Sequence, residues 1–412
     1  MSGWVSTSVA DCLVPVPVAG KSKVQSRDYK QAGRYPVVDQ GQDQFAGWTD
    51  DEDAVIDTPL PLVVFGDHTR AFKFLDKPFA RGADGTQLLR PKSDINPLFF
   101  FYACRAIDLP ARGYNRHFTA LKEKTLSYPI HDGEQKTIAS VLRKTELALA
   151  KQAELLKTLR ELKQATMQQL FTRGLRGESQ KETEIGLMPE SWNFDPIGNH
   201  FSVVSGGTPS RAIPSYWNGG TIPWVKTTEV NYCVIEQTGE HITPEGLAGS
   251  AAKLLPKGTL LLAMYGQGVT RGRVAILGIE AACNQACAAL TKKDDAVATK
   301  FLYHFLTWRY TATRELAHGG QQQNLNLDIV RDMPIAYPTA LQAQQQITET
   351  LDAIDAKIAL HQKKQAVLEE LFRTLLHKLM TGELSVNDLD LTAIQDFATS
   401  NVAATTTEGS TT

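Results

Sequence analysis

The stretch YPIHDGEQKTIASVLRKTELALAKQAELLKTLRELKQATMQQLFTRGL (residues 128–175) decides the fold. It returns as YPTALQAQQQITETLDAIDAKIALHQKKQAVLEELFRTLLHKLMTGEL (residues 337–384), and the two copies align without a gap. The identical pairs include Gln135/Gln344, Ile138/Ile347, Leu142/Leu351, Leu159/Leu368, Leu162/Leu371, Leu170/Leu379, Thr172/Thr381 and Leu175/Leu384. A repeat of this length indicates a duplicated architecture, in which a globular half and a long helix occur twice.

Apolar residues recur at three- and four-residue spacing along both copies, a pattern typical of helices that pack side by side. One helix of about 40 residues, roughly 60 Å long, cannot bury such a stripe alone. We therefore expect the two helices to form an antiparallel coiled coil, with the polar residues Gln152, His361 and Gln365 fixing its register. The predicted seam is Ile138, Leu142, Leu149, Leu156, Leu159 and Leu170 with Ile347, Leu351, Ile354, Ile358, Leu368, Phe372, Leu375 and Leu379.

The repeat predicts an α+β protein with two mixed α/β domains, two long helices between them and an internal pseudo-two-fold. Gly174 and Gly382 follow the last seam residues, where a left-handed cap would end each helix. The charged stretch Arg176–Glu184 reads as a connector, and the composition beyond about Val386 is typical of a solvated tail. The expected segments are a first domain at 1–130, a helix at 131–178, a linker at 179–190, a second domain at 191–338, a helix at 339–386 and a disordered tail at 387–412.

The two globular halves also resemble each other, more weakly than the helices do. The matches are Trp4-x4-Val9 with Trp192-x4-Ile197, Tyr35–Asp39 with Ile222–Lys226, Val63–Gly66 with Ala263–Gly266, and Thr69-Arg70 with Thr270-Arg271. Leu60–Phe65 reads as a buried strand, and Pro97–Tyr102 reads as a strand or a short core helix. The shared positions favour a common scaffold.

Composition bounds the class of protein. The chain has 412 residues, of which 42% are hydrophobic and 21% charged, which is ordinary for a globular protein. It shows no secretory signal and no run of about 18 apolar residues, so we expect a cytoplasmic protein without a membrane span. The net charge of −2 argues against simple binding to nucleic acid, and suggests that a partner supplies part of any phosphate contact.

Sequence signatures of enzymes are absent. We find no phosphate-binding Gly-x4-Gly-Lys-Ser/Thr loop, no dinucleotide motif, no Gly-x-Ser-x-Gly elbow, no His-Glu-x-x-His and no Asn/Asp-Pro-Pro-Tyr/Phe tetrapeptide. Five cysteines are an odd and sparse set, which fits reduced thiols. Cys283 and Cys287 could lie one helical turn apart, although buried thiols are a better interpretation than a metal site. No catalytic or metal-binding residue is predicted.

Polar loops provide the positive signal. Arginine can bond guanine O6 and N7, and glutamine or asparagine can bond adenine N6 and N7, while glycines let the backbone approach phosphate. Several glycine-rich loops hold these residue types at matching places in both halves. The predicted DNA-binding residues are His68, Arg70, Arg81 and Arg116 in the first half and Lys226, Gln267, Arg271, Arg273, Asn284, Gln285, Gln322 and Asn324 in the second.

Three further segments resemble a known family. Leu170–Trp192 looks like the junction in specificity subunits of type I restriction-modification systems. The motif Ser205-Gly-Gly-Thr-Pro-Ser210, followed by Tyr216–Gly219 and Ile222–Lys226, resembles the opening of their target recognition domains. The run Leu371–Leu384 resembles the end of their second spacer helix, so the resemblance covers everything except the tail.

This resemblance implies a non-catalytic subunit whose two recognition domains each read one half of a bipartite site on double-stranded DNA. The helices would set the gap between the half-sites. Similar proteins assemble with two methyltransferase subunits, which bind S-adenosylmethionine, and in some systems with restriction subunits that use ATP and Mg. The first domain departs from the family pattern because it lacks an equivalent of the Ser205–Ser210 motif.

Two other classes remain open from the residues alone. The chain could be a coiled-coil scaffold whose globular halves bind proteins or other ligands, and the long helices do not distinguish that class from a DNA reader. A nuclease or methyltransferase in its own right would have to show turnover by the isolated chain, and we expect none.

Overall fold

The computed structural model describes residues 3–18, 20–82, 85–110, 116–266, 269–316 and 324–389. The chain divides into two compact units. Unit 1 contains the residues up to Glu154 together with those from Lys363 onward, and unit 2 contains Leu155–Gln362. Each unit therefore includes a stretch of both long helices.

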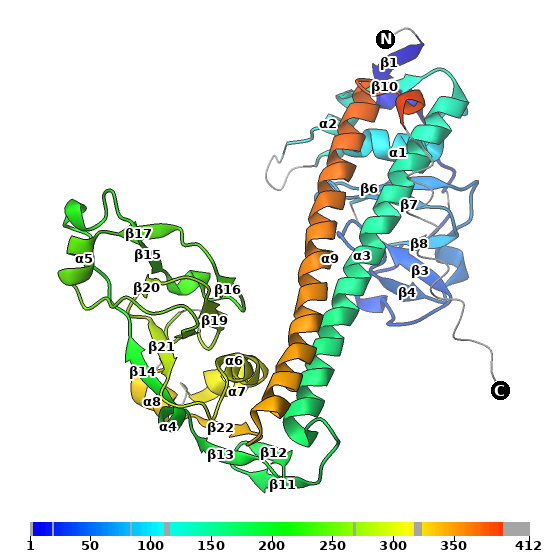
Figure 1. Cartoon of the computed structure of the whole chain (residues 1–412). Coiled ribbons are helices and arrows are strands. Elements are labelled where there is room, and N and C mark those ends of the chain that lie inside the picture. The colour runs from blue at the N-terminus through cyan, green and yellow to red at the C-terminus, as the bar shows by residue number, and fades with distance from the viewer. Residues whose placement is uncertain are drawn as a thin grey trace. The chain divides into compact units, whose positions relative to one another are not determined.

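The two long helices are α3 (Asp132–Arg173) and α9 (Leu341–Thr381), drawn as the green and orange rods of Figure 1. In unit 1 the core contains Ile138 near the start of α3 and Leu379 near the end of α9. In unit 2 the core contains Leu170 near the end of α3 and Ile347 near the start of α9. The helices pack together and run antiparallel, as predicted.

Both long helices end directly before the glycines predicted to cap them, so they are shorter than the expected segments 131–178 and 339–386. The residues after them, Gly174 and Gly382, have φ values of 64° and 69°, in the left-handed region that glycine adopts most easily. None of the predicted seam residues is exposed. Buried are Ile138, Leu142, Leu156, Leu159, Leu170, Ile347, Leu351, Leu368, Leu375 and Leu379, and half-buried are Leu149, Ile354, Ile358 and Phe372.

Unit 1 contains a four-stranded sheet in the order β2-β9-β6-β7, a second in the order β4-β3-β8-β5, and the pair β1-β10. Its strands are β1 Trp4–Ser8, β2 Leu13–Val14, β3 Tyr35–Val38, β4 Gly47–Thr49, β5 Val55–Ile56, β6 Leu62–Gly66, β7 Phe72–Leu75, β8 Phe79–Arg81, β9 Thr86–Pro91 and β10 Thr125–Pro129. Its short helices are α1 (Pro97–Ala106) and α2 (Phe118–Glu123). Pro97–Tyr102 is therefore helical, and its phenylalanines fill the core beside α3.

Unit 2 has a five-stranded sheet in the order β14-β21-β18-β19-β16, a three-stranded sheet β17-β15-β20, and the pairs β13-β22 and β11-β12. Its strands are β11 Gln180–Thr183, β12 Gly186–Pro189, β13 Asn193–Pro196, β14 Phe201–Ser205, β15 Ile222–Val225, β16 Val234–Ile235, β17 Glu240–Ile242, β18 Leu260–Ala263, β19 Val274–Leu277, β20 Ala282–Cys283, β21 Cys287–Lys292 and β22 Pro334–Tyr337. Its short helices are α4 Ile197–His200, α5 Pro244–Ala248, α6 Thr299–Trp308, α7 Tyr310–Glu315 and α8 Leu327–Asp332.

The same pattern of backbone hydrogen bonds occurs within each of the two units. The parallel pairing of β3 with β8 matches that of β15 with β20, so Val38 opposite Arg81 corresponds to Val225 opposite Cys283. The backbone N–H of Val9 donates to Lys124 as that of Ile197 donates to Met333. These positions have the register that the sequence matches predicted.

Two of the predicted matches are wrong in register. The N–H of Gly66 donates to Ala71, and the equivalent bond in unit 2 runs from Ala263 to Arg273, so Gly66 corresponds to Ala263 and not to Gly266. The bond from Arg70 to Gly66 likewise corresponds to the bond from Gly272 to Ala263. Arg70 therefore takes the place of Gly272, with φ values of 62° and 85°, and is not the counterpart of Arg271. The connection after β18 is longer than the one after β6, and a gapless match cannot show where the extra residues lie.

Two smaller expectations also change. Cys283 ends β20 and Cys287 begins β21, so the two thiols are not on one helix, and both are buried. The short 3-10 helix η7 (Val386–Asp388) and the following Leu389 pack against the core of unit 1. The packed chain thus extends past residue 387, where we expected the tail to begin, and residues 390–412 lie outside the described residues. Among the described helices, none is long and apolar enough to cross a membrane.

Candidate nucleic-acid interface

In unit 2, several strands end at the same edge of the sheets. Ser205 at the end of β14 pairs with Ala288, and Ala263 at the end of β18 pairs with Cys287. β15 and β20 run parallel and end at Val225 and Cys283. We call the loops at these strand ends, residues 205–211, 226–229, 264–266, 269–273 and 284–286, the loop edge of unit 2. They hold five of the eight side chains of the second half that are predicted to contact DNA.

Two glycines of the Ser205–Ser210 motif let this loop lie directly on its neighbours. The N–H of Gly206 donates to Cys287 at 3.2 Å, and that of Gly207 donates to Cys283 at 2.8 Å. A Cβ on Gly206 would lie 2.1 Å from the carbonyl oxygen of Cys283, and one on Gly207 would lie 2.2 Å from the nitrogen of Ala252. Only glycine fits at either position, so the motif fixes the path of the loop.

Neutral polar side chains hold the centre of this loop edge. Thr227 Oγ1 donates to Asn284 Oδ1 at 2.8 Å, and Thr208 Oγ1 donates to Gln285 Oε1. Both amides are thereby oriented through their oxygens, which directs the NH₂ groups elsewhere. Gln285 is exposed and Asn284 half-buried. Such fixed amides have the chemistry needed to bond base edges.

The remaining predicted residues of unit 2 flank this centre. Arg273 Nη1 donates to Asn231 Oδ1 at 2.7 Å, and its guanidinium lies over the ring of Tyr232. Arg271 is half-buried in the same loop. Asn324 is exposed next to Leu325, whose N–H donates to Met264 at 3.2 Å. The predicted residues Gln267 and Gln322 lie outside the described residues.

Unit 1 has a corresponding loop edge, formed by residues 39–42, 67–71, 81–82, 85 and 116–118. His68 and Arg70 lie in the turn between β6 and β7, and Arg70 Nη1 donates to the carbonyl of Leu109 at 2.7 Å. Arg81 ends β8 beside Val38. Arg116 is exposed and precedes His117, whose N–H donates to Asp67 as that of Leu325 donates to Met264. All four predicted residues of the first half therefore lie at one edge.

A cluster of charged and aromatic residues at the loop edge of unit 2 was missed by the sequence reasoning. The guanidinium of Arg211 lies 3.5 Å from the centre of the Trp217 ring, and its Nη2 lies 2.5 Å from Glu240 Oε2. The other oxygen of Glu240 lies 3.0 Å from Lys226 Nζ. The hydrogen bond from Lys226 and the charge of Arg211 lower the pKa of this carboxyl. The available signal was the arginine that directly follows Ser210.

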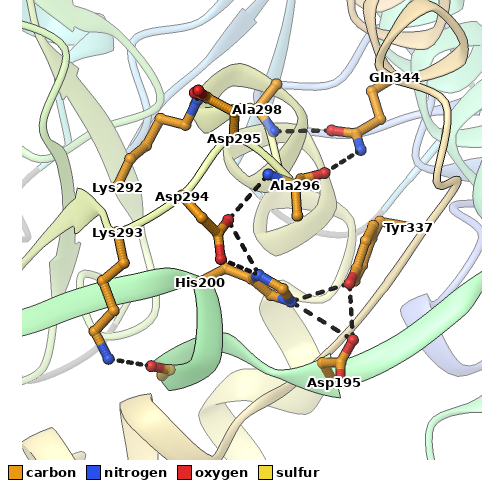
Figure 2. A network of polar contacts seen from close by, with 11 residues as sticks. Asp195, His200, Lys292, Lys293, Asp294, Asp295, Ala296, Ala298, Tyr337 and Gln344 are labelled. Atoms are coloured by element: carbon orange, nitrogen blue, oxygen red, sulfur yellow. Dashed lines mark hydrogen bonds and ion pairs between the residues drawn. The ribbon is translucent and has the colours of Figure 1, made fainter.

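The opposite edge of the five-stranded sheet is built as an anchor (Figure 2). His200 Nδ1 lies 3.0 Å from Asp294, and its Nε2 lies 3.0 Å from the hydroxyl of Tyr337, which donates to Asp195 at 2.8 Å. The N–H of Ala296 donates to Asp294 and is the first cause that lowers the pKa of that carboxyl, while burial raises the pKa of Tyr337. Every ring nitrogen of this histidine is engaged within the fold, which suits a structural role.

The loop that contains Asp294 is also hydrogen-bonded to the start of α9. Gln344 Nε2 donates to the carbonyls of Ala296 at 2.7 Å and Pro338 at 2.9 Å, and its Oε1 accepts from the N–H of Ala298 at 2.8 Å. Part of this network appears in Figure 2. Among the residues that the structure describes, no group of three or more His, Cys, Asp and Glu side chains could hold a metal ion.

Comparisons with known proteins agree with this geometry. The family described as "Type I restriction modification DNA specificity domain" matches residues 189–370. The specificity subunit of the type I restriction enzyme MjaIX of Methanocaldococcus jannaschii is 30% identical over 49% of this chain and 47% of its own length, so this chain spans about half of that relative. The EcoR124I/EcoR124II specificity subunit of Escherichia coli is 23% identical over 81% of this chain and 83% of its own length.

Solved structures show the same fold. The type I restriction-modification S subunit from M. genitalium superposes with a TM-score of 0.65 at 17% identity, covering 92% of this chain and 96% of that one. A chain from work on complex assembly and conformational transition of the type I R-M system superposes with a TM-score of 0.53 at 16% identity, covering 93% of this chain and 99% of that one. Residues 189–370 thus match a type I restriction modification DNA specificity domain, and the relatives that this chain resembles are specificity subunits of type I restriction enzymes.

Proposed function

We propose that this chain reads a bipartite site on double-stranded DNA, with one half-site at the loop edge of each unit. The recognition domains would be residues 1–130 and 191–338, joined through the linker at 179–190. The helices α3 and α9, which lie within the expected segments 131–178 and 339–386, would set the gap between the half-sites, as modules held at a fixed spacing do elsewhere. The chain itself would be non-catalytic, and methyl transfer would occur on bases flipped into partner subunits.

One observation carries this proposal: the two loop edges share a backbone framework but differ in side chains. Asp39 after β3 takes the place of Lys226 after β15, because Val38 and Val225 are equivalent. Gly82 takes the place of Asn284, since their N–H groups donate to Val38 and Val225. A common frame with different polar groups is what two readers of different sequences need, because base-edge contacts select the sequence while phosphate contacts position the protein.

We further propose that two methyltransferase subunits bind this chain, and that restriction subunits join in assemblies that also cleave DNA. A chain with a net charge of −2 fits a division of labour in which partners supply much of the phosphate contact. The long helices offer repeated surfaces for a partner that binds twice. Leu162 on α3 and Leu371 on α9 occupy the same repeat position and are 51% and 43% exposed.

Methylated adenines in host DNA, mapped by single-molecule sequencing with and without this gene, test the central claim. The expected result is a two-part motif with a fixed gap that disappears when the gene is removed. Loss of the gene without any change in methylation would favour the scaffold class instead.

Partner number is tested by three matched substitutions on the full chain. Leu162→Glu and Leu371→Glu should each reduce the number of methyltransferase subunits per chain by one, as read by native mass spectrometry. Leu187→Glu is the control, because Leu187 is also 51% exposed but lies on β12. Equal stoichiometry in all three variants would place the partner elsewhere.

A further inference from the structure

Glu240 is the shared partner of two cations at the loop edge of unit 2. One of its oxygens faces Arg211 at 2.5 Å and the other faces Lys226 at 3.0 Å. The side chains of Arg211, Lys226 and Glu240 are 55%, 41% and 27% exposed. Exposed pairs of this kind add little to folding stability, so the cluster is free to open when a stronger ligand arrives.

A phosphate group is such a ligand. Arginine binds phosphate with two parallel hydrogen bonds, and its planar group stacks on aromatic rings. The guanidinium of Arg211 already lies over the ring of Trp217, which restricts its orientation. Trp217 Nε1 donates to the carbonyl of Ser210 at 3.1 Å, and this bond fixes the ring against the same loop. Arg211 and Lys226 are therefore placed to contact the DNA backbone beside the amides of Asn284 and Gln285. While Glu240 holds them, neither cation has its full attraction for phosphate.

We propose that Glu240 is a specificity-determining residue, which weakens the contact of Arg211 and Lys226 with the phosphates of DNA that lacks the target sequence. On target DNA, hydrogen bonds to base edges offset the cost of opening the cluster. On other DNA those bonds are missing, and the cations stay with Glu240. The carboxylate thus lowers non-specific affinity more than specific affinity. This inference rests on the proposed function.

The test compares Glu240→Gln with Asp295→Asn in the full chain. Both changes remove one negative charge from an ion pair of unit 2, since Asp295 lies 2.5 Å from Lys292. Asn284 lies before the start of β21 and Asp295 lies after its end. The control residue is therefore at the edge of the sheet opposite the loop edge. Binding is measured by fluorescence anisotropy for the full chain assembled with methyltransferase subunits, between about 50 and 200 mM salt. The two DNA ligands are a duplex that the wild-type assembly selects from a random library and an unselected duplex.

Glu240→Gln should raise affinity for the unselected duplex about 3- to 10-fold and steepen its salt dependence by about one to two phosphate contacts. The ratio of selected to unselected affinity should fall, and Arg211→Gln added to Glu240→Gln should restore it. A result for Glu240→Gln equal to that for Asp295→Asn, or an equal loss on both duplexes, would overturn this inference while leaving the proposed function intact. A wild-type chain that selects no sequence even when assembled with methyltransferase subunits would overturn both.

Discussion

The loop edges of the two units have the same backbone framework but carry different side chains. At equivalent backbone positions unit 1 has Asp39 where unit 2 has Lys226, and Arg70 where unit 2 has Gly272. Even the left-handed conformation is shared at the second pair, although arginine adopts it at a cost that glycine does not have. The backbone hydrogen bonds are kept while the groups that face outward change. The framework therefore specifies the fold, and under the proposed function the side chains that it carries would determine the recognised sequence.

The opposite situation holds at the starts of the long helices. Gln135 Nε2 donates to Pro129 and Asp94, and its Oε1 accepts from Asn96 at 2.7 Å. Gln344 makes the same three bonds to Pro338, Ala296 and Ala298. Here both the residue and its bonds are kept, and both side chains are fully buried. Each glutamine ties a long helix to the start of a short core helix, which is a task common to both units.

The largest expected effect comes from shortening both helices together. Removing residues 151–157 and 360–366 takes out seven residues at repeat-equivalent positions and keeps the seam, whose period is 3.5. Each rod loses about 10.5 Å, so the permitted gap between half-sites should shorten by at most about three base pairs. Preference for the original gap should fall by about 4 kcal/mol or more, because one half-site is lost. Gap length is read from methylation motifs in cells with the shortened chain.

Shortening only one helix provides the control for this prediction. Removal of residues 151–157 alone makes α3 seven residues shorter while α9 keeps its length, so the two seams no longer match. This change should lower stability instead of selecting a new gap. Retention of the original gap by the doubly shortened chain would show that the helices do not set it.

The next effect tests the glutamine pair. Gln135→Leu and Gln344→Leu each leave two carbonyls and one N–H without their partner in a buried place, at about 1–3 kcal/mol for each group. We expect local destabilisation of about 3–5 kcal/mol. Hydrogen exchange should show faster opening around α1 for the first variant and around α6 for the second. Faster exchange in both units from one variant would contradict a local role.

The sequence could predict the framework wherever both copies kept a residue for the same physical reason. Trp4 and Trp192, and Tyr35 and Ile222, were matched in the correct register because β1, β13, β3 and β15 have the same neighbours in both units. The match of Gly66 with Gly266 failed because a shared glycine says nothing about the hydrogen-bond register around it. Arg211 and Glu240 were missed since their pairing joins residues 29 positions apart, and no spacing rule connects them.

A smaller effect tests whether each loop edge reads its own half-site. Arg271→Ala in unit 2 and Arg70→Ala in unit 1 should each weaken specific binding by about 1–3 kcal/mol if the side chain bonds a base. Each variant should relax preference in one half-site and leave the other unchanged. Binding to a set of duplexes with single base changes measures this directly. A uniform loss across all duplexes would assign the arginine to phosphate contact instead.

The smallest effect concerns how each unit attaches its short core helix to a long one. In unit 1, Glu146 on α3 accepts from Tyr102 at 2.8 Å and pairs with Arg105 on α1. In unit 2, Asp352 on α9 lies 2.8 Å from His304 Nε2 and 2.7 Å from Lys300 Nζ, both on α6. The hydrogen bond from His304 is the main cause that lowers the pKa of Asp352 to about 2.

Because that pKa lies below the ordinary value of 3.8, Asp352 contributes stability above about pH 4, and the contribution is lost as the pH falls through about 2. The carboxylate is 38% exposed, so screening by solvent reduces the contribution to about 1 kcal/mol. Thermal unfolding of Asp352→Asn should therefore differ from wild type at pH 6 and converge with it near pH 2. Asp328→Asn, which removes an exposed partner of Arg331, should show no such convergence. A constant difference across the whole pH range would mean that packing of the side chain, and not its charge, joins α6 to α9.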